Sequence, residues 1–197
     1  ALVDYLPNPH VKKRADGTFY VENGDKALGS VSGFLGNFSV MVRAYTYILS
    51  LGKENIKMVG PLATLNANYI KESLKEDYYL PIEDICKHEF MFDGLVDKST
   101  GVTTLDIAKR LLDYGYHAPT IYFPLLFHQS IMIEPTETES IETLDEFIHI
   151  MKVVAQEAKD DPESVRTAPH TTPVRRLDET TAAKHPILSY RDLLKEV

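Results

Sequence analysis

A long stretch with one apolar stripe, residues 141–158, constrains the fold of this chain most. Apolar residues recur there at helical spacing, and Thr138 or Ser140 can cap the start of the helix. Two short apolar segments precede it, residues 120–123 and 130–134, and both read as strands. Since the stripe must be covered, the pattern predicts a helix packed on a small sheet. The residues of the stripe are Ile141, Leu144, Ile148, Met151, Ala155 and Ala158.

The first third of the chain predicts a turn-rich segment followed by a helix. Residues 1–30 are rich in proline and glycine, and Asp16-Gly17 favours a tight hairpin turn. Residues 38–51 then carry apolar side chains at helical spacing, and Gly52 closes that helix. We expect a connecting segment and then an amphipathic helix.

The middle of the chain predicts two further helices and two short strands. Pro61 suits the first turn of a helix, whose inner face is expected to carry Leu62, Leu65, Tyr69 and Leu74. Residues 78–80 and 89–92 are strand candidates. Thr103 or Thr104 can cap a helix that ends at Gly115, with an inner face formed by Leu105, Ala108, Leu111 and Leu112.

This order of elements predicts an α/β (α+β) fold with a small, mainly antiparallel sheet and helices packed on one face. We divide the chain into a connecting segment, residues 1–30, a domain, residues 31–165, and an irregular tail, residues 166–197. Prolines 169, 173 and 186 prevent long elements in the tail.

The charge distribution disfavours nucleic acid and anionic membranes as partners. The net charge is −8, and residues 134–163 carry ten acidic residues against Lys152 and Lys159. The most apolar stretch, residues 118–133, is too short and too interrupted by polar residues and prolines to span a bilayer. We therefore expect a soluble domain that binds neither nucleic acid nor a membrane.

A single cysteine, Cys86, excludes an intramolecular disulfide and makes a reducing compartment the default, so we expect the cytoplasm. No signal peptide opens the sequence. The first residue is alanine rather than methionine, which suggests an excerpt from a longer polypeptide.

Two short motifs allow both a structural and a functional interpretation. The turn that ends in Gly36-Asn37 opens a helix, whose free N–H groups can hold a phosphate, although such turns also serve simply as helix entries. The acidic string 134–140 suits a helix start, because carboxylates there face the macrodipole. Alternatively, Glu134 at the end of an apolar strand can face a cleft.

The residues alone do not complete an active site. His88-Glu89 begins a zinc-hydrolase motif, but its second histidine is absent because position 92 is Phe, so no metal site is expected. No lysine stands in a glycine-rich or apolar context, although an enzyme that binds pyridoxal phosphate covalently needs a desolvated lysine. No Ser/His/Asp grouping has a recognisable spacing.

Several longer strings resemble one family, the P-protein of the glycine cleavage system. The strings are residues 65–70, 88–90, 104–112, 117–124, 132–140 and 168–179, read as LNANYI, HEF, TLDIAKRLL, HAPTIYFP, MIEPTETES and APHTTPVRRLDE. The tail resembles the form whose P-protein is split in two, and the match is to subunit 2. The resemblance implies the C-terminal domain of a fold-type I enzyme that uses pyridoxal 5'-phosphate, with the cofactor-binding lysine outside this chain.

The resemblance also implies a reaction, partners and site residues. The full enzyme is expected to decarboxylate glycine and pass the aminomethyl group to the lipoylated H-protein, together with P-protein subunit 1, as a dimer or heterotetramer. This fragment is expected to be inactive alone, with no catalytic residue assigned in it. Gly36 and Asn37 are expected near the cofactor phosphate. The cleft candidates are His88, Glu134, Thr136 and Glu137.

Two alternatives remain open at the level of sequence. The domain could be a non-catalytic module for dimerisation or regulation. It could also belong to another fold-type I enzyme such as an aminotransferase, which needs an arginine for the substrate carboxylate. Arg43 and Arg110 both fall on helices rather than in a cleft.

Overall fold

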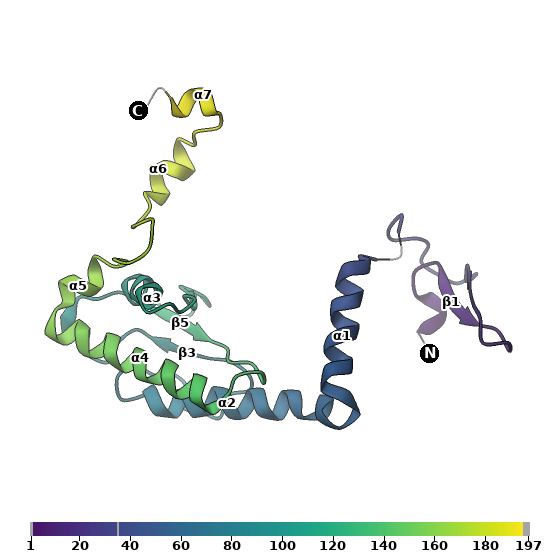
Figure 1. Ribbon diagram of the computed structural model, residues 1–197, viewed down its shortest axis with the longest axis horizontal. Helices are drawn as coiled ribbons and strands as arrows, with labels where there is room; N and C mark the ends of the chain where they lie inside the picture. The colour runs from purple at the N-terminus through teal and green to yellow at the C-terminus, as the bar shows by residue number, and fades with distance from the viewer. Residues whose placement is uncertain (1, 35, 195–197) are drawn as a thin grey trace. The chain divides into compact units, whose positions relative to one another are not determined.

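A computed structural model describes residues 2–34 and 36–194 (Figure 1). The chain divides between Ile56 and Lys57 into two compact units. The first unit contains a short 3-10 helix, Val3–Tyr5, and the strands β1, His10–Lys13, and β2, Phe19–Glu22, paired antiparallel.

The turn between β1 and β2 confirms the predicted hairpin. Asp16 Oδ1 accepts hydrogen bonds from the Thr18 backbone N–H at 2.9 Å and from the Thr18 hydroxyl at 2.7 Å. Gly17 has φ +89°, a backbone conformation that a side chain would strain. The local turn chemistry of Asp-Gly therefore decides where this hairpin turns.

Helix α1, Phe38–Asn55, follows in the first unit. Asn37 caps it, because its side chain accepts a hydrogen bond from the Val40 N–H at 3.2 Å. The sequence predicts that Gly52 closes this helix; in the structure Gly52, with φ +69°, interrupts the helical path, which then continues to Asn55. A 3-10 turn, Ile56–Met58, continues the chain.

The second unit contains a three-stranded antiparallel sheet and the helices that cover it (Figure 1). The strands β3, Phe90–Asp93, β4, Thr120–Ile121, and β5, Ser130–Ile133, lie in the order β3-β5-β4. This antiparallel sheet confirms the predicted fold class. The remaining elements are α2 (Val59–Leu74), a 3-10 turn (Lys98–Thr100), α3 (Thr104–Asp113), α4 (Ile141–Asp160), α5 (Pro162–Arg166), α6 (Glu179–Lys184) and α7 (Tyr190–Leu193).

One face of this sheet forms the core with the helices. Phe90 pairs with Ile133, and Phe92 pairs with Ile131, and all four side chains are buried. They pack in one cluster with the inner faces of α2, α3 and α4. Met91 and Met132, which pair between these positions, point to the opposite face because side chains alternate along a strand. The helices therefore pack on one face, as predicted.

The inner face of α2 differs from the prediction. Leu62, Leu65 and Tyr69 are exposed, and Tyr69 instead donates a hydrogen bond to Asp145 of α4. The small Ala63 and Ala67 allow the helix backbone to approach the core closely, and two polar residues share that face because they find partners there. The buried residues are Ala63, Asn66, Ala67, Ile70, Lys71 and Leu74.

Other boundaries shift by a few residues. The predicted strand at 78–80 is only an isolated bridge between Tyr78 and Leu95. Strand β4 ends at Ile121, because Tyr122 has φ +57°, outside the extended region. On α4, Ser140 is the cap and Ile141 is exposed, whereas the unpredicted Val154 is buried. On α3, Ile107 is fully buried, and Leu105 and Leu112 are only half-buried.

Candidate functional site

Two of the cleft candidates, His88 and Glu134, lie next to each other where β3 begins and β5 ends. The His88 Nε2 and a Glu134 carboxylate oxygen are 3.9 Å apart, and both side chains are more than half exposed. The register explains the approach: β3 starts at Phe90 and pairs with Ile133, so the residues before β3 lie beside those after β5. When His88 is protonated the two form an ion pair, which contributes little to stability at an exposed position.

Helix α2 holds both backbone segments that carry this pair. Asn66 Nδ2 donates to the Thr136 carbonyl at 2.9 Å. The Asn68 side chain makes two hydrogen bonds with the Cys86 backbone: its Nδ2 donates to the Cys86 carbonyl at 2.9 Å, and its Oδ1 accepts from the Cys86 N–H at 3.1 Å. Three separate strings, 65–70, 88–90 and 132–140, therefore meet in space. The sequence interpretation missed both asparagines, although they stand in the first string.

The acidic string 134–140 divides into two parts with different surroundings. Ser140 caps α4 by accepting a hydrogen bond from the Thr143 N–H at 3.3 Å. The Thr136 and Thr138 hydroxyls are 2.6 Å apart, and Glu137 is half-buried. Glu134 stands well before the helix, beside His88. Ser140 therefore caps α4, whereas Glu134, directly after β5, takes no part in capping and is available to face a cleft.

Glu134 also lines a groove of about 520 Å³ between β5 and the start of α4. Its neighbours include Tyr116, His117, Pro119, Glu139 and Phe147. A second hollow, of about 360 Å³, lies on the face of Met91 and Met132 that the helices leave uncovered and includes Cys86 in its lining. Glu134 is thus the cleft candidate with a groove beside it, and the roles of Thr136 and Glu137 stay predictions.

Gly36 and Asn37 belong to the first unit. Gly36 has φ +127°, so the position requires glycine for backbone reasons. The Asn37 side chain is engaged in capping α1. The contact of these residues with a cofactor phosphate stays a prediction.

Lys71 corrects the expectation about lysine environments, because it is buried to 1% exposure on α2. Its Nζ donates to the Asp84 carbonyl at 2.7 Å and to the Glu83 carbonyl at 3.1 Å, and it lies 3.4 Å from a Glu72 carboxylate oxygen. The ammonium group therefore anchors the 83–84 loop. The other lysines at positions 2–34 and 36–194 are exposed, apart from the half-buried Lys109. None of these fits a sheltered, available amine of the kind that binds pyridoxal phosphate.

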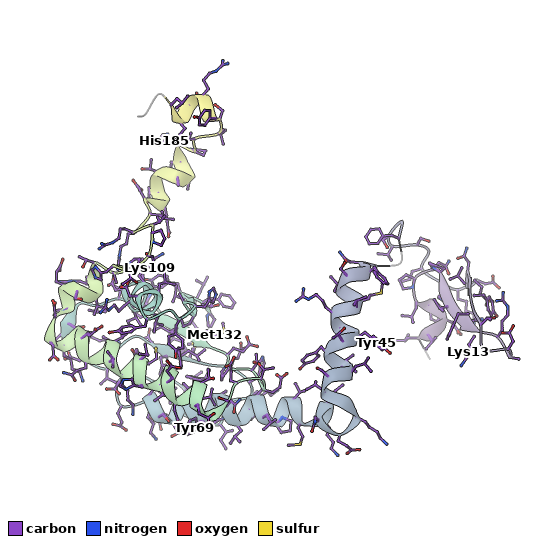
Figure 2. All side chains as sticks on the ribbon, viewed as in Figure 1. Lys13, Tyr45, Tyr69, Lys109, Met132 and His185 are labelled. Carbon is purple, nitrogen blue, oxygen red and sulfur yellow. The ribbon has the colours of Figure 1, made fainter. Side chains whose placement is uncertain are left out.

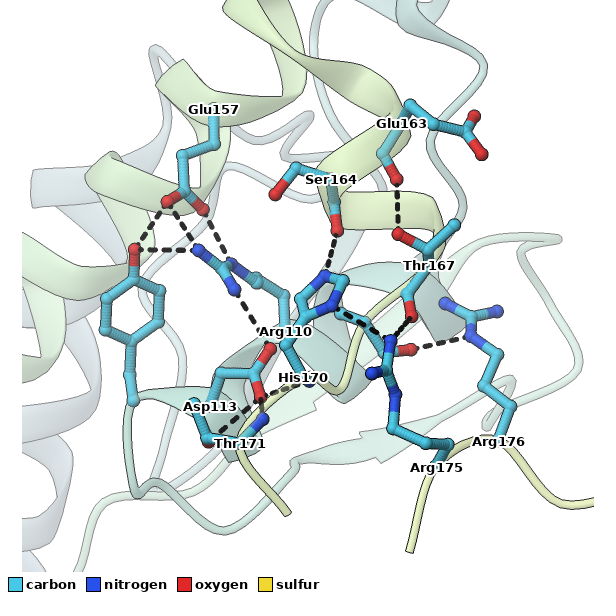
Figure 3. A network of polar contacts seen from close by, with 12 residues as sticks. Arg110, Asp113, Glu157, Glu163, Ser164, Thr167, His170, Thr171, Arg175 and Arg176 are labelled. Carbon is cyan, nitrogen blue, oxygen red and sulfur yellow. Dashed lines mark hydrogen bonds and ion pairs between the residues drawn. The ribbon is translucent and has the colours of Figure 1, made fainter.

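A polar network ties the start of the tail to α3 and α4 (Figure 3). Asp113 accepts hydrogen bonds from the His170 N–H at 2.5 Å and the Thr171 N–H at 2.8 Å. Arg110 donates to both Glu157 oxygens, at 2.9 and 2.8 Å, and to Asp113 at 2.9 Å. This occupied guanidinium does not suit a substrate carboxylate, which weakens the aminotransferase alternative.

The same network shifts the pKa values of its members. Burial raises the pKa of Asp113, but hydrogen bonds from Thr171, His170 and Arg110 outweigh that effect and leave the pKa below its usual value. The hydrogen bond from Arg110 likewise lowers the pKa of Glu157, and Glu157 raises that of Arg110. All three groups are charged at neutral pH. Outside the network, burial raises the pKa of the Cys86 thiol.

Within residues 2–34 and 36–194, no three histidine, cysteine or acidic side chains stand close enough together to hold a metal ion. Over the same part of the chain, no helix combines the length and the apolar character that crossing a membrane requires.

Known proteins resemble this chain in sequence and in fold. "Probable glycine dehydrogenase (decarboxylating) subunit 2" of Alkaliphilus oremlandii is 54% identical over 191 residues, which are 96% of this chain and 39% of that protein. The protein of the same name from Staphylococcus haemolyticus is 55% identical over 196 residues, 99% of this chain and 40% of the relative. The chain thus spans about two fifths of the length of these curated relatives.

A solved structure of glycine decarboxylase (P-protein) in inhibitor-bound form shares the fold. Its TM-score is 0.52 at 16% identity, over 77% of this chain and 36% of that one. A family model described as "Glycine dehydrogenase, C-terminal domain" matches residues 59–175, more than half of the chain. That range starts with α2 and ends within the anchored part of the tail. The chain therefore belongs to the family of glycine dehydrogenase C-terminal domains.

Proposed function

We propose that this chain is the C-terminal part of a glycine decarboxylase that uses pyridoxal 5'-phosphate, the P-protein subunit 2 of a glycine cleavage system. The family match over residues 59–175 carries the proposal. The structure adds that three strings that resemble the family meet around His88 and Glu134, and that Glu134 lines a groove.

In this proposal the full enzyme removes carbon dioxide from glycine and passes the aminomethyl group to the lipoyl arm of the H-protein. It acts with P-protein subunit 1, as a dimer or heterotetramer, in the cytoplasm. Pyridoxal phosphate, when bound, supplies the electron sink that makes decarboxylation feasible. The cofactor-binding lysine comes from outside this chain, since the best sheltered lysine of the described residues, Lys71, is engaged by carbonyl groups.

The role proposed for this domain is to form one wall of the cleft. Glu134 lines the groove and His88 stands 3.9 Å from it, so the pair can accept, hold or return a proton at the imidazole Nε2. Asn66 and Asn68 keep the two backbone segments together and so act as positioning residues. Gly36 and Asn37 are proposed to approach the cofactor phosphate at the start of α1.

The test is to locate the lysine that holds the cofactor. The full-length polypeptide is combined with subunit 1 and pyridoxal phosphate, reduced with borohydride, digested and analysed by mass spectrometry. The modified lysine is expected outside the present chain. In parallel, carboxyl-labelled glycine should release carbon dioxide with lipoylated H-protein present, and residues 1–197 alone should release none.

Two outcomes would contradict the proposal. A stoichiometric borohydride-reducible adduct on a lysine of this chain, for instance Lys71, would refute the proposal that the cofactor-binding lysine lies outside this chain. A full-length polypeptide with subunit 1 that binds no pyridoxal phosphate would instead favour the non-catalytic dimerisation or regulatory module.

A further inference from the structure

The described residues of the first unit form no core of their own. None of the residues 2–34 and 36–56 is buried, whereas the second unit contains the entire buried cluster. Large apolar side chains are nevertheless frequent in the first unit. A segment of this size that exposes so much apolar surface gains too little from folding alone to offset its conformational entropy. Something else must cover it.

Helix α1 concentrates this exposed apolar surface, and Figure 2 shows its side chains, Tyr45 among them, projecting from the helix. Phe38 is 76% exposed, Tyr45 64% and Leu49 61%. At about 100° per residue, apolar side chains occupy roughly two thirds of the circumference of residues 38–51. We call this surface the apolar arc; it comprises Phe38, Val40, Met41, Val42, Ala44, Tyr45, Tyr47, Ile48, Leu49 and Leu51.

The opposite side of α1 is a narrow polar strip, formed by Ser39, Arg43, Thr46 and Ser50. A helix on the surface of a globular protein has the reverse proportions, with an apolar stripe that covers the smaller part of its circumference. A helix that is apolar around most of its circumference is normally buried inside a protein. The arc is therefore a packing surface that needs a partner on more than one side.

Charge and chain length favour one partner over another. A second copy of the chain would reach the arc with its own arc only through self-association, which depends on protein concentration, and the surface of its α4 belongs to the acidic segment 134–163, whose carboxylates find no partner on an apolar arc. About three fifths of each relative's length, by contrast, lies outside the part that this chain covers, and the matching family is a C-terminal domain. In a polypeptide of the relatives' length, the additional part lies N-terminal to this domain, and covalent linkage gives it a high effective concentration at the arc.

We propose that the apolar arc of α1 is an intramolecular docking surface, covered by the part of the same polypeptide that lies N-terminal to this domain. The inference rests on the proposed function, in which that part holds the cofactor. Docking of α1 would also bring its first turn, with Gly36 and Asn37, against the cofactor-holding part, whereas the second unit keeps its own core.

The experiment measures thiol labelling at two adjacent positions in the full-length polypeptide, with Cys86 replaced by serine. Leu49→Cys lies in the arc, and Ser50→Cys lies on the polar strip and serves as the matched control. Peptide mass spectrometry follows maleimide labelling of each site. We expect Leu49→Cys to react at least tenfold more slowly than Ser50→Cys, and we expect the difference to vanish in residues 1–197 alone.

A second measurement avoids substitutions. Hydroxyl-radical footprinting of the unmodified proteins should oxidise Phe38 and Tyr45 readily in residues 1–197 and poorly in the full-length polypeptide. Equal labelling at both cysteines with ready oxidation of both aromatics in the full-length polypeptide would overturn the inference. Protection that appears only at concentrations where the polypeptide self-associates would also overturn it, since a second copy would then be the cover.

These readouts involve neither pyridoxal phosphate nor glycine, so the two proposals fail separately. A protected arc in a polypeptide that never binds the cofactor refutes the proposed function and keeps the docking surface. An exposed arc in an active decarboxylase refutes the docking surface alone.

Discussion

Replacing Asn68 by alanine should release the segment that carries His88. The side chain of Asn68 makes two hydrogen bonds to the Cys86 peptide, at 2.9 and 3.1 Å, and a third to the Thr64 carbonyl of its own helix at 2.8 Å. The two bonds to Cys86 join α2 to the chain before β3. Leaving that half-buried peptide group without partners is expected to cost about 2–3 kcal/mol.

Two assays on residues 57–197, the unit that contains the core, follow this change. Urea unfolding should show a free energy of unfolding lower by about 2–3 kcal/mol with an unchanged slope. Cys86 is the only cysteine and is half-buried, so its labelling rate reports local opening. A local loss of 2 kcal/mol should raise that rate by about 30-fold.

Gln156→Ala is the matched control, since its amide bonds only the exposed Asp160 carboxylate. It should change the free energy of unfolding by less than about 0.5 kcal/mol. If Asn68→Ala behaves like this control, with unchanged labelling of Cys86, the reasoning that Asn68 positions the His88 segment is refuted.

Four further predictions concern the tail network and the cleft. Asp113→Ala should lower the free energy of unfolding by about 3 kcal/mol and make the tail after residue 167 sensitive to limited proteolysis, because two backbone N–H groups and Arg110 lose their acceptor. Arg110→Lys should lower it by about 1–2 kcal/mol in urea unfolding, because lysine lacks the planar fork of donors that bonds both Glu157 oxygens and Asp113 at once. Asp113 and Glu157 have lowered pKa values in the folded state, so their contribution is present above the unfolded pKa and is lost as the pH falls through the folded pKa; urea unfolding from pH 7 to pH 3 should show stability falling toward acid. His88→Gln in the full-length enzyme should reduce carbon dioxide release by about 10²-fold, in the range for a lost proton-transfer group.

Each of these predictions has a control or a contrary result. Asp160→Ala, on the exposed end of α4, is the control for Asp113→Ala, and equal proteolysis of the two would exclude the anchoring role. For the pH effect, the free energy of unfolding of Asp113→Ala is measured over the same pH range as that of the wild type. The variant should lose less stability toward acid, and an equal loss would assign the effect to other carboxyl groups. His149→Gln is the control, because His149 is an exposed histidine. Full activity of His88→Gln would refute the proton-transfer role proposed for His88 and Glu134.

Features encoded by neighbouring residues were predictable from the sequence. The hairpin turn follows from Asp16-Gly17, the interruption of α1 from Gly52, and the long helix α4 from its apolar period and the Ser140 cap. The family resemblance identified the strings that meet around His88 and Glu134. These features depend on backbone preferences and short-range periodicity, which a chain carries whatever its tertiary structure.

Only the tertiary structure decided which side chains face the core and which meet. Asn66 and Lys71 lie inside because the carbonyl groups of Thr136, Glu83 and Asp84 accept hydrogen bonds from their side chains. These partners are distant in sequence. A pattern of polarity along the chain therefore does not reveal them and assigns both residues to the surface. His88 and Glu134 are neighbours only because β3 and β5 pair in one register, and a shift of one residue would change the alignment of their segments. Pairing register and buried polar partners are long-range properties, and no local pattern contains them.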